Sequence, residues 1–147
     1  MTASYVGAAE AIVAESVIRA NITKTLTPVS GNTIAQSDMV KVTIDIEYYD
    51  DAPDGTYTLT DYIPSGMRLV RVDTYANSWL YDSKTWYLSN QEKQQLIFVN
   101  HNKAVQLEYY LQAILPGEFV VDSAHLQHDS TAARGSSVAG TVIVDPR

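Results

Sequence analysis

A strict two-residue alternation over Met39 to Tyr49 constrains this chain more than any other feature of its sequence. Apolar side chains alternate with polar ones there, as Val40, Val42, Ile44 and Ile46 against Lys41, Thr43, Asp45 and Glu47. Because successive side chains of a β-strand point to opposite faces, this period predicts a strand with one buried face and one solvated face. The chain must therefore contain a sheet that packs against a core on one side.

Further segments show the features of strands, and short clusters of turn-forming residues separate them. Pro53 to Gly55, Pro64 to Gly66 and Pro116-Gly117 are three such clusters. The predicted strands are 17–26, 39–49, 56–63, 67–74, 95–99, 104–114, 119–121 and 138–144, with a strand, turn and strand over 79–88. We expect a hairpin turn at 100–103 and a polar loop over 122–137. Seven to nine strands without a long helical period predict an all-β sandwich.

The length of 147 residues fits one domain with a hydrophobic core, which we place at residues 17–147. We interpret residues 1–16 as an N-terminal tail, or as the last strand of a preceding module. The Ala-rich stretch from Ala8 to Glu15 leaves a short helix as an alternative, although eight residues make only a marginal helix.

Composition excludes several classes of function. Hydrophobic residues make up 46% of the chain and charged residues 18%, as in globular proteins. The net charge of -7 argues against binding of nucleic acid or of anionic lipid, since both need a basic surface. Cysteine is absent, so the chain has no disulfide, thiolate nucleophile, cysteine zinc site or thioester.

The sequence also lacks the motifs of common catalytic sites. There is no Gly-x-Ser-x-Gly nucleophile elbow, and the segment Gly135 to Gly140 has the wrong spacing for one. No glycine-rich phosphate loop is present. We therefore expect a domain that is not an enzyme, with no cofactor and no small-molecule substrate.

Two groups of side chains contain residue types that bind metal ions. Asp50, Asp51 and Asp54 precede Gly55 closely enough to be calcium candidates, although an acidic turn explains them as well. His125, His128 and Asp129 lie near one another, and His101 lies in the predicted turn; without further ligands these residues are expected in solvated loops.

Aromatic residues suggest a second kind of site. Trp79, Tyr81, Trp86 and Tyr87 would serve as a platform for a sugar, which makes a carbohydrate-binding module one alternative. Aromatic side chains in strands more often pack in the core or across strands, and that is the interpretation we prefer.

Two segments resemble a known family. One is Thr58 to Met67, a strand that runs into an Ile-Pro-Ser-Gly turn; the other is Tyr109 to Val144, with a strand, a Pro-Gly turn and a closing Gly-x-Val-x-Val strand. They are similar to the C-terminal domain of bacterial alpha-2-macroglobulins, and the likeness extends over residues 17–144. The resemblance implies an immunoglobulin-like or macroglobulin-like sandwich in a larger, extracytoplasmic bacterial protein that traps proteases. Such a domain contacts neighbouring domains of its chain, and the parent binds the trapped protease.

The alternative to the macroglobulin is an immunoglobulin-like repeat of a bacterial cell-surface adhesin. Sandwich domains of adhesins can cross-link a lysine to an asparagine or aspartate with a glutamate nearby. The candidates for such a cross-link in this sequence are Lys24 or Lys41, with Glu47 or Glu108 and Asp145.

Overall fold

A computed structural model describes residues 17–72 and 86–147, and every regular element in these ranges is a β-strand. The all-β prediction is thereby confirmed. The strands are β1 (Ala20–Pro28), β2 (Ile34–Ala35), β3 (Met39–Tyr48), β4 (Tyr57–Tyr62), β5 (Met67–Val72), β6 (Tyr87–Glu92), β7 (Gln95–Asn100), β8 (Gln106–Ala113), β9 (Gly117–Val121), β10 (His125–His128), β11 (Arg134–Ser136) and β12 (Gly140–Asp145).

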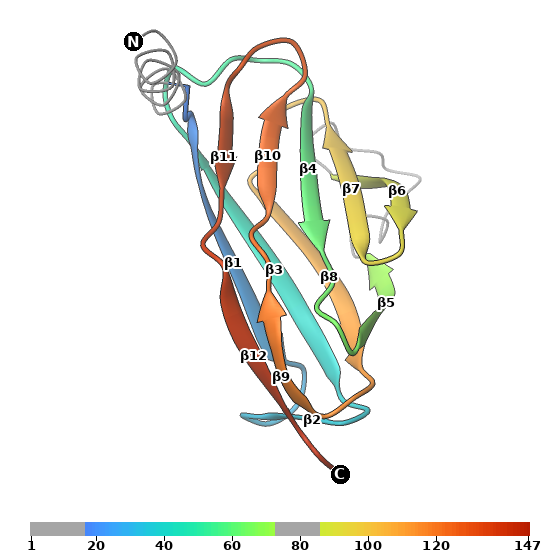
Figure 1. Ribbon diagram of the computed structural model, residues 1–147. Helices are drawn as coiled ribbons and strands as arrows, with labels where there is room; N and C mark the ends of the chain where they lie inside the picture. The colour runs from blue at the N-terminus through green and yellow to red at the C-terminus, as the bar shows by residue number, and fades with distance from the viewer. Residues whose placement is uncertain (1–16, 73–85) are drawn as a thin grey trace, which may run out of the picture.

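These strands form a two-layered sandwich. One layer is a four-stranded antiparallel sheet in the order β1-β3-β8-β5. Facing it are a five-stranded sheet, β11-β10-β4-β7-β6, and a small sheet, β2-β12-β9. Figure 1 shows the four-stranded sheet behind the others, with β12 below β11 and β9 below β10. In the small sheet β12 pairs in parallel with β2 and antiparallel with β9.

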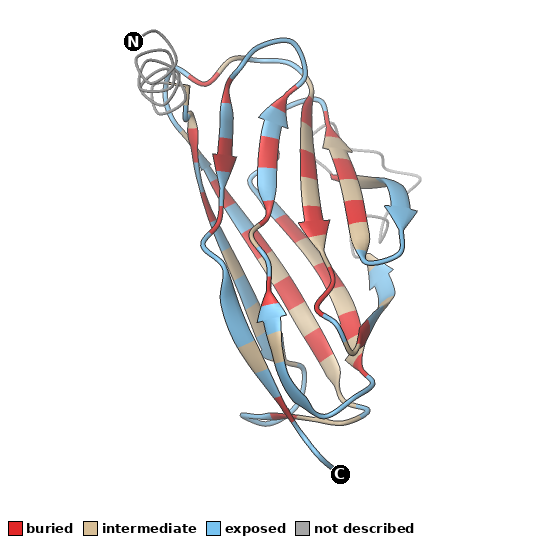
Figure 2. Ribbon diagram, in the orientation of Figure 1, coloured by how far each residue is buried: buried red, intermediate tan, exposed pale blue. Residues whose placement is uncertain are grey.

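The core lies between the two layers and is built by alternation on both sides (Figure 2). In β3 every second residue from Val40 to Ile46 is buried, as the sequence pattern predicts. Strand β8 buries alternate residues from Leu107 to Ala113, and β4, β7 and β10 do the same from the opposite layer. Burying each large apolar side chain contributes about 1.5–3 kcal/mol, so this two-sided packing is the main source of stability.

The prediction of seven to nine strands was too low, because three short strands were missed. Strand β2 has two residues, and β10 and β11 fall within the segment 122–137 that was predicted to be a loop. Strand β10 pairs with both β4 and β11. Its strand conformation therefore depends on backbone hydrogen bonds, because its sequence has little apolar alternation. Its inward residues are Leu126 and His128. Because histidine is polar, the sequence pattern does not indicate that position 128 is buried.

The predicted hairpin at 100–103 was also wrong. Strand β7 pairs with β4 and β6, whereas β8 pairs with β3 and β5, so the connection crosses from one sheet to the other. The buried side chain of Asn100 organises this crossing. Its Oδ1 accepts the backbone N–H groups of Asn102 at 2.8 Å and Ala104 at 2.9 Å. Side-chain capping of this kind satisfies buried backbone donors that a hairpin would have paired.

The start of the described chain is fixed to the sandwich by its backbone. The N–H of Arg19 donates to the carbonyl of Arg134 at 2.9 Å, and the N–H of Arg134 donates to the carbonyl of Val17 at 3.1 Å. The domain start at residue 17 and the interpretation of residues 1–16 both stay predictions. In the described part of the chain there is no helix with the length and apolar character needed to cross a membrane.

Gly66, in the turn between β4 and β5, is expected to resist substitution. Its φ is +81°, and a Cβ there would lie 2.7 Å from the Phe119 ring. A Gly66→Ala variant should lose about 1–2 kcal/mol from backbone strain alone, plus the cost of moving the ring. Urea unfolding measures the loss of unfolding free energy in Gly66→Ala, with Gly31→Ala as the control. Gly31 has a φ of +75° but nothing within 4 Å, so equal losses would contradict a role for Phe119.

Candidate functional site

A buried polar cluster of three side chains, Lys24, Asp61 and Tyr109, lies between the two layers. Lys24 comes from β1 and Tyr109 from β8 of the same sheet, while Asp61 comes from β4 of the opposite layer. The Lys24 Nζ lies 2.7 Å from Asp61 Oδ1, and the Tyr109 hydroxyl donates a hydrogen bond to Asp61 Oδ2. The side chains of Lys24 and Asp61 are 1% and 0% exposed, so water is excluded from their contact.

Strand alternation explains why these polar groups point inward. Lys24 continues the inward series of Ala20 and Ile22 along β1, and Asp61 follows Tyr57 and Leu59 along β4. In the sequence, Lys24 shares alternate positions with Ala20, Ile22 and Leu26, and this pattern places it on the apolar face of the strand predicted over 17–26. The same pattern, applied to residues 57–63, places Asp61 on the face of Leu59, yet sequence reasoning did not single this residue out.

Every polar group of the cluster has a partner. Besides Asp61, the Lys24 ammonium donates to the backbone carbonyls of Tyr62 at 3.3 Å and Asp122 at 3.2 Å. Three acceptors match the three N–H bonds of an ammonium group. Burying an unpaired charge costs several kcal/mol, so this full set of contacts is what allows the cluster to exist in the core.

The Tyr109 hydroxyl is held in its protonated form. Burial raises the pKa of Tyr109 well above its usual value of 10.0, and the neighbouring Asp61 charge and hydrogen bond raise it further. Burial also raises the pKa of Tyr48, whose hydroxyl donates to the Ala104 carbonyl at 2.9 Å. Both phenols therefore act as hydrogen-bond donors throughout the neutral and mildly alkaline range.

These raised pKa values predict a loss of stability at alkaline pH. Above pH 10 the tyrosines of the unfolded chain release protons that Tyr109 retains in the folded chain. The unfolded state then binds fewer protons, so the free energy of unfolding falls as pH rises, by about 1 kcal/mol per pH unit for Tyr109. Chemical unfolding from pH 8 to pH 11 measures the slope. Tyr48→Phe and Tyr109→Phe variants should each have a shallower slope, and unchanged slopes would contradict the assignment.

The three calcium candidates do not converge in the structure. Asp51 pairs with Arg19 at 3.2 Å, and Asp54 pairs with Lys103 at 3.0 Å, while Asp50 is exposed. Across 17–72 and 86–147 no three histidine or acidic side chains form a group that could hold a metal ion. Calcium binding at Asp50, Asp51 and Asp54 stays a prediction, and titrating calcium while following the melting temperature tests it.

The histidines of the segment 122–137 have separate surroundings. His125 is exposed, whereas His128 is buried in β10 and packs edge-on against Tyr57 with ring centroids 4.9 Å apart. The expectation that His128 lies in a solvated loop was therefore wrong. His128 Nε2 contacts the Asp54 carbonyl at 2.7 Å, and its Nδ1 accepts the N–H of Thr131 at 3.1 Å. These contacts give His128 a structural role in joining two loops.

The proposed sugar platform is not formed by the residues that the structure describes. Trp86 is fully buried, and its Nε1 donates to the Ala104 carbonyl at 3.3 Å. Tyr87 is half-buried, with its hydroxyl 2.8 Å from His101 Nε2. His101 also contacts the Thr56 hydroxyl at 2.8 Å. Trp79 and Tyr81 lie outside the described residues.

The candidate residues for a cross-link lie apart in the structure. Lys41 pairs with Glu108 at 2.9 Å on the outer face of the four-stranded sheet, where both side chains are partly exposed. Glu47 is exposed, and Asp145 pairs with Ala35 in the small sheet. Only Lys24 among them lies in the core, and its carboxylate partner is Asp61.

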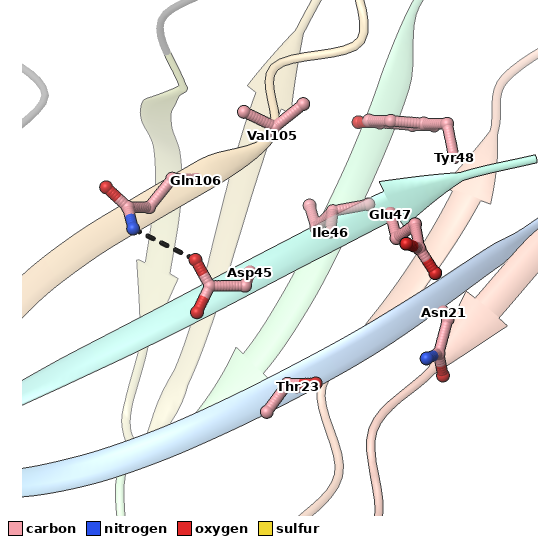
Figure 3. A pocket seen from close by; sticks show the side chains of 8 residues that line it. All are labelled: Asn21, Thr23, Asp45, Ile46, Glu47, Tyr48, Val105 and Gln106. Atoms are coloured by element: carbon pink, nitrogen blue, oxygen red, sulfur yellow. Dashed lines mark hydrogen bonds between the residues drawn. The ribbon is translucent and has the colours of Figure 1, made fainter.

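A groove with both polar and apolar side chains crosses the outer face of the four-stranded sheet (Figure 3). In it Gln106 Nε2 donates to Asp45 Oδ1 at 2.9 Å. The groove is lined by Asn21, Thr23, Asp45, Ile46, Glu47, Tyr48, Val105 and Gln106. The polar side chains among them can hydrogen-bond to a protein surface.

The fold is similar to that of bacterial β-sandwich modules. The cohesin module of a family 33 glycoside hydrolase from Clostridium perfringens superposes with a TM-score of 0.56 and 12% identity, over 88% of this chain and 99% of that one. CaCohA2 from Clostridium acetobutylicum gives 0.52 and 14%, over 87% and 92%. The major pilin SpaD from Corynebacterium diphtheriae gives 0.53 and 10%, over 84% of this chain and 35% of the pilin.

No protein-family model matches the sequence, and no curated protein matches it. At such low identities the structural likeness defines the fold, an immunoglobulin-like β-sandwich of the kind seen in bacterial cohesin and pilin modules. None of the three neighbours is a macroglobulin domain.

Proposed function

We propose that the chain is a non-catalytic structural module of a bacterial extracytoplasmic protein, and that it holds neighbouring domains or chains through its surfaces. The observation that carries the proposal is the fold likeness to cohesin and pilin modules over 84–88% of the chain. The adhesin-type repeat is the version of this role that the neighbours favour.

The path of the chain through the sandwich supports a module joined end to end. Strand β1 begins at one end of the sandwich and β12 finishes at the other (Figure 1). Neighbouring domains attached at these two points would follow one another along the long axis. The buried Lys24–Asp61 contact joins the two layers of the sandwich. A force applied along the long axis would therefore act on a polar contact in the core.

Exposure of the parent protein on the cell surface tests the proposal. Intact cells that express the gene are treated with a protease that cannot enter them, and an antibody against this domain then probes a blot. We expect the signal to disappear from intact cells while a cytoplasmic marker survives. Protection in intact cells and in cells with a permeabilised outer envelope, with digestion only after the cytoplasmic membrane is lysed, would contradict an extracytoplasmic module.

The narrower role, a domain of a protease-trapping macroglobulin with trapped proteases as partners, stays a prediction that rests on the segment from Tyr109 to Val144. The gene of the parent protein discriminates between the two. A long linker that a protease can cut, together with a thioester motif upstream, would favour the protease trap. Tandem copies of this domain with a sorting signal would favour the adhesin.

A further inference from the structure

The contact between Lys24 and Asp61 brings an amine and a carboxyl group together under conditions that favour bond formation. We propose that the two side chains condense to an amide, so that an intramolecular cross-link joins β1 to β4 across the core. The proposal rests on this geometry alone and is independent of where the parent protein resides.

Positioning is the first requirement, and the fold supplies it. Nζ lies 2.7 Å from Asp61 Oδ1, so the carboxyl carbon is the next atom within reach of the nitrogen. The carbonyls of Tyr62 and Asp122 fix the amine from two other directions. Groups held in this way react as if at effective concentrations on the order of 10⁵–10⁸ M, which offsets the ordinary preference for hydrolysis in water.

Exclusion of water is the second requirement. The reaction needs a neutral amine, and the direct contact between Nζ and Oδ1 gives one ammonium proton a path to the carboxylate as the reaction begins. Both side chains are at most 1% exposed. Once the released water molecule has left, solvent water therefore has little access to hydrolyse the amide.

The reaction balances without any other reactant. The nitrogen lone pair of Lys24 attacks the carboxyl carbon of Asp61 and forms the C–N bond. The tetrahedral intermediate loses one oxygen as water, which takes up the carboxyl proton and one proton from the nitrogen. The product is a neutral amide, and the chain loses the mass of one water molecule.

Tyr109 is positioned to assist this reaction. Its hydroxyl donates a hydrogen bond to Asp61 Oδ2, the oxygen that does not contact Lys24. A donor at that position stabilises the negative charge that builds up on the oxygen when the nitrogen attacks, as in an oxyanion hole. We therefore assign Tyr109 as the hydrogen-bond donor that activates the carboxyl group.

The mass of the purified, denatured chain tests the cross-link directly. We expect the intact mass to be lower than the sequence mass by one water molecule. Tandem mass spectrometry of a protease digest should then join the peptide that contains Lys24 to the one that contains Asp61. A mass equal to that of the sequence would overturn the proposal, and a bond from Lys24 to Asp122 would overturn the choice of Asp61.

Variants separate the roles of the three residues. Lys24→Arg and Asp61→Ala should each have the full sequence mass, and Asp61→Asn should lose ammonia in place of water. Tyr109→Phe should reduce the cross-linked fraction at least tenfold in freshly purified protein; an unchanged fraction would overturn the role of Tyr109. Lys41→Arg is the matched control, because its pair with Glu108 is partly exposed, and it should retain the mass of the cross-linked chain.

Discussion

An Asp61→Ala variant is expected to lose at least 3–5 kcal/mol of unfolding free energy, roughly the cost of leaving a buried charge without its partner. The substitution removes the carboxylate that pairs with Lys24 Nζ and leaves the Tyr109 hydroxyl without its acceptor. Denaturant unfolding followed by tryptophan fluorescence measures the loss. A change below about 1 kcal/mol would contradict the central role of this cluster.

A triple variant distinguishes the ion pair from the amide. Lys24→Met, Asp61→Leu and Tyr109→Phe together remove all three polar groups, so no buried charge or hydroxyl remains unpaired. A simple ion pair replaced in this way often costs little. A cross-link between residues 37 apart in sequence contributes about 4 kcal/mol to the free energy of unfolding, from the loss of loop entropy in the unfolded chain. The triple variant should be less stable than the wild type by that amount. Wild-type stability in the triple variant would contradict the amide.

The surface pair of Lys41 and Glu108 provides the control for this experiment. Both side chains are partly exposed, and such pairs contribute about 1 kcal/mol or less. A Lys41→Met, Glu108→Leu double variant is therefore expected to unfold within about 1 kcal/mol of the wild type.

A Trp86→Ala variant is expected to lose about 3–5 kcal/mol, the usual cost of truncating a buried tryptophan. Trp86 is fully buried and donates to the Ala104 carbonyl, so its removal leaves a cavity and takes away one of the two donors to that carbonyl, the other being the Tyr48 hydroxyl. Thermal and urea unfolding measure the effect. Val138→Ala, at a position 91% exposed, should remain within about 0.5 kcal/mol of the wild type.

The result at Trp86 also bears on the sugar-binding alternative. A small loss of stability in Trp86→Ala would mean that the indole is accessible, as a carbohydrate platform requires. A large loss, together with no binding on a glycan array, would remove Trp86 from any such site.

Much of the sandwich could be predicted from alternation because one face of each long strand is buried. Val40 to Ile46 and Leu107 to Ala113 carry that pattern clearly, and both are strands with the expected inward faces. Strands β10 and β11 could not be found in this way. Their pairing depends on backbone hydrogen bonds to neighbours far apart in sequence, and their few inward residues include His128 and Gly135.

The polar cluster could be predicted only in part. Alternation placed Lys24 on an inward face, but the sequence does not show which carboxylate lies opposite it. That depends on the packing of one layer against the other, which sets β4 across from β1. Asp145, the acidic partner considered from the sequence, lies in the small sheet, where it pairs with Ala35.

Mechanical unfolding of the single module, pulled from its two ends, tests the central claim that a covalent link joins the two layers. If Lys24 and Asp61 are cross-linked, the segment between them cannot extend. The gain in contour length should then fall short of the full chain by roughly 120–130 Å, for 37 residues at 3.3–3.6 Å each. The Lys24→Arg variant should release that length. A wild-type gain equal to the whole unfolded chain would contradict the account.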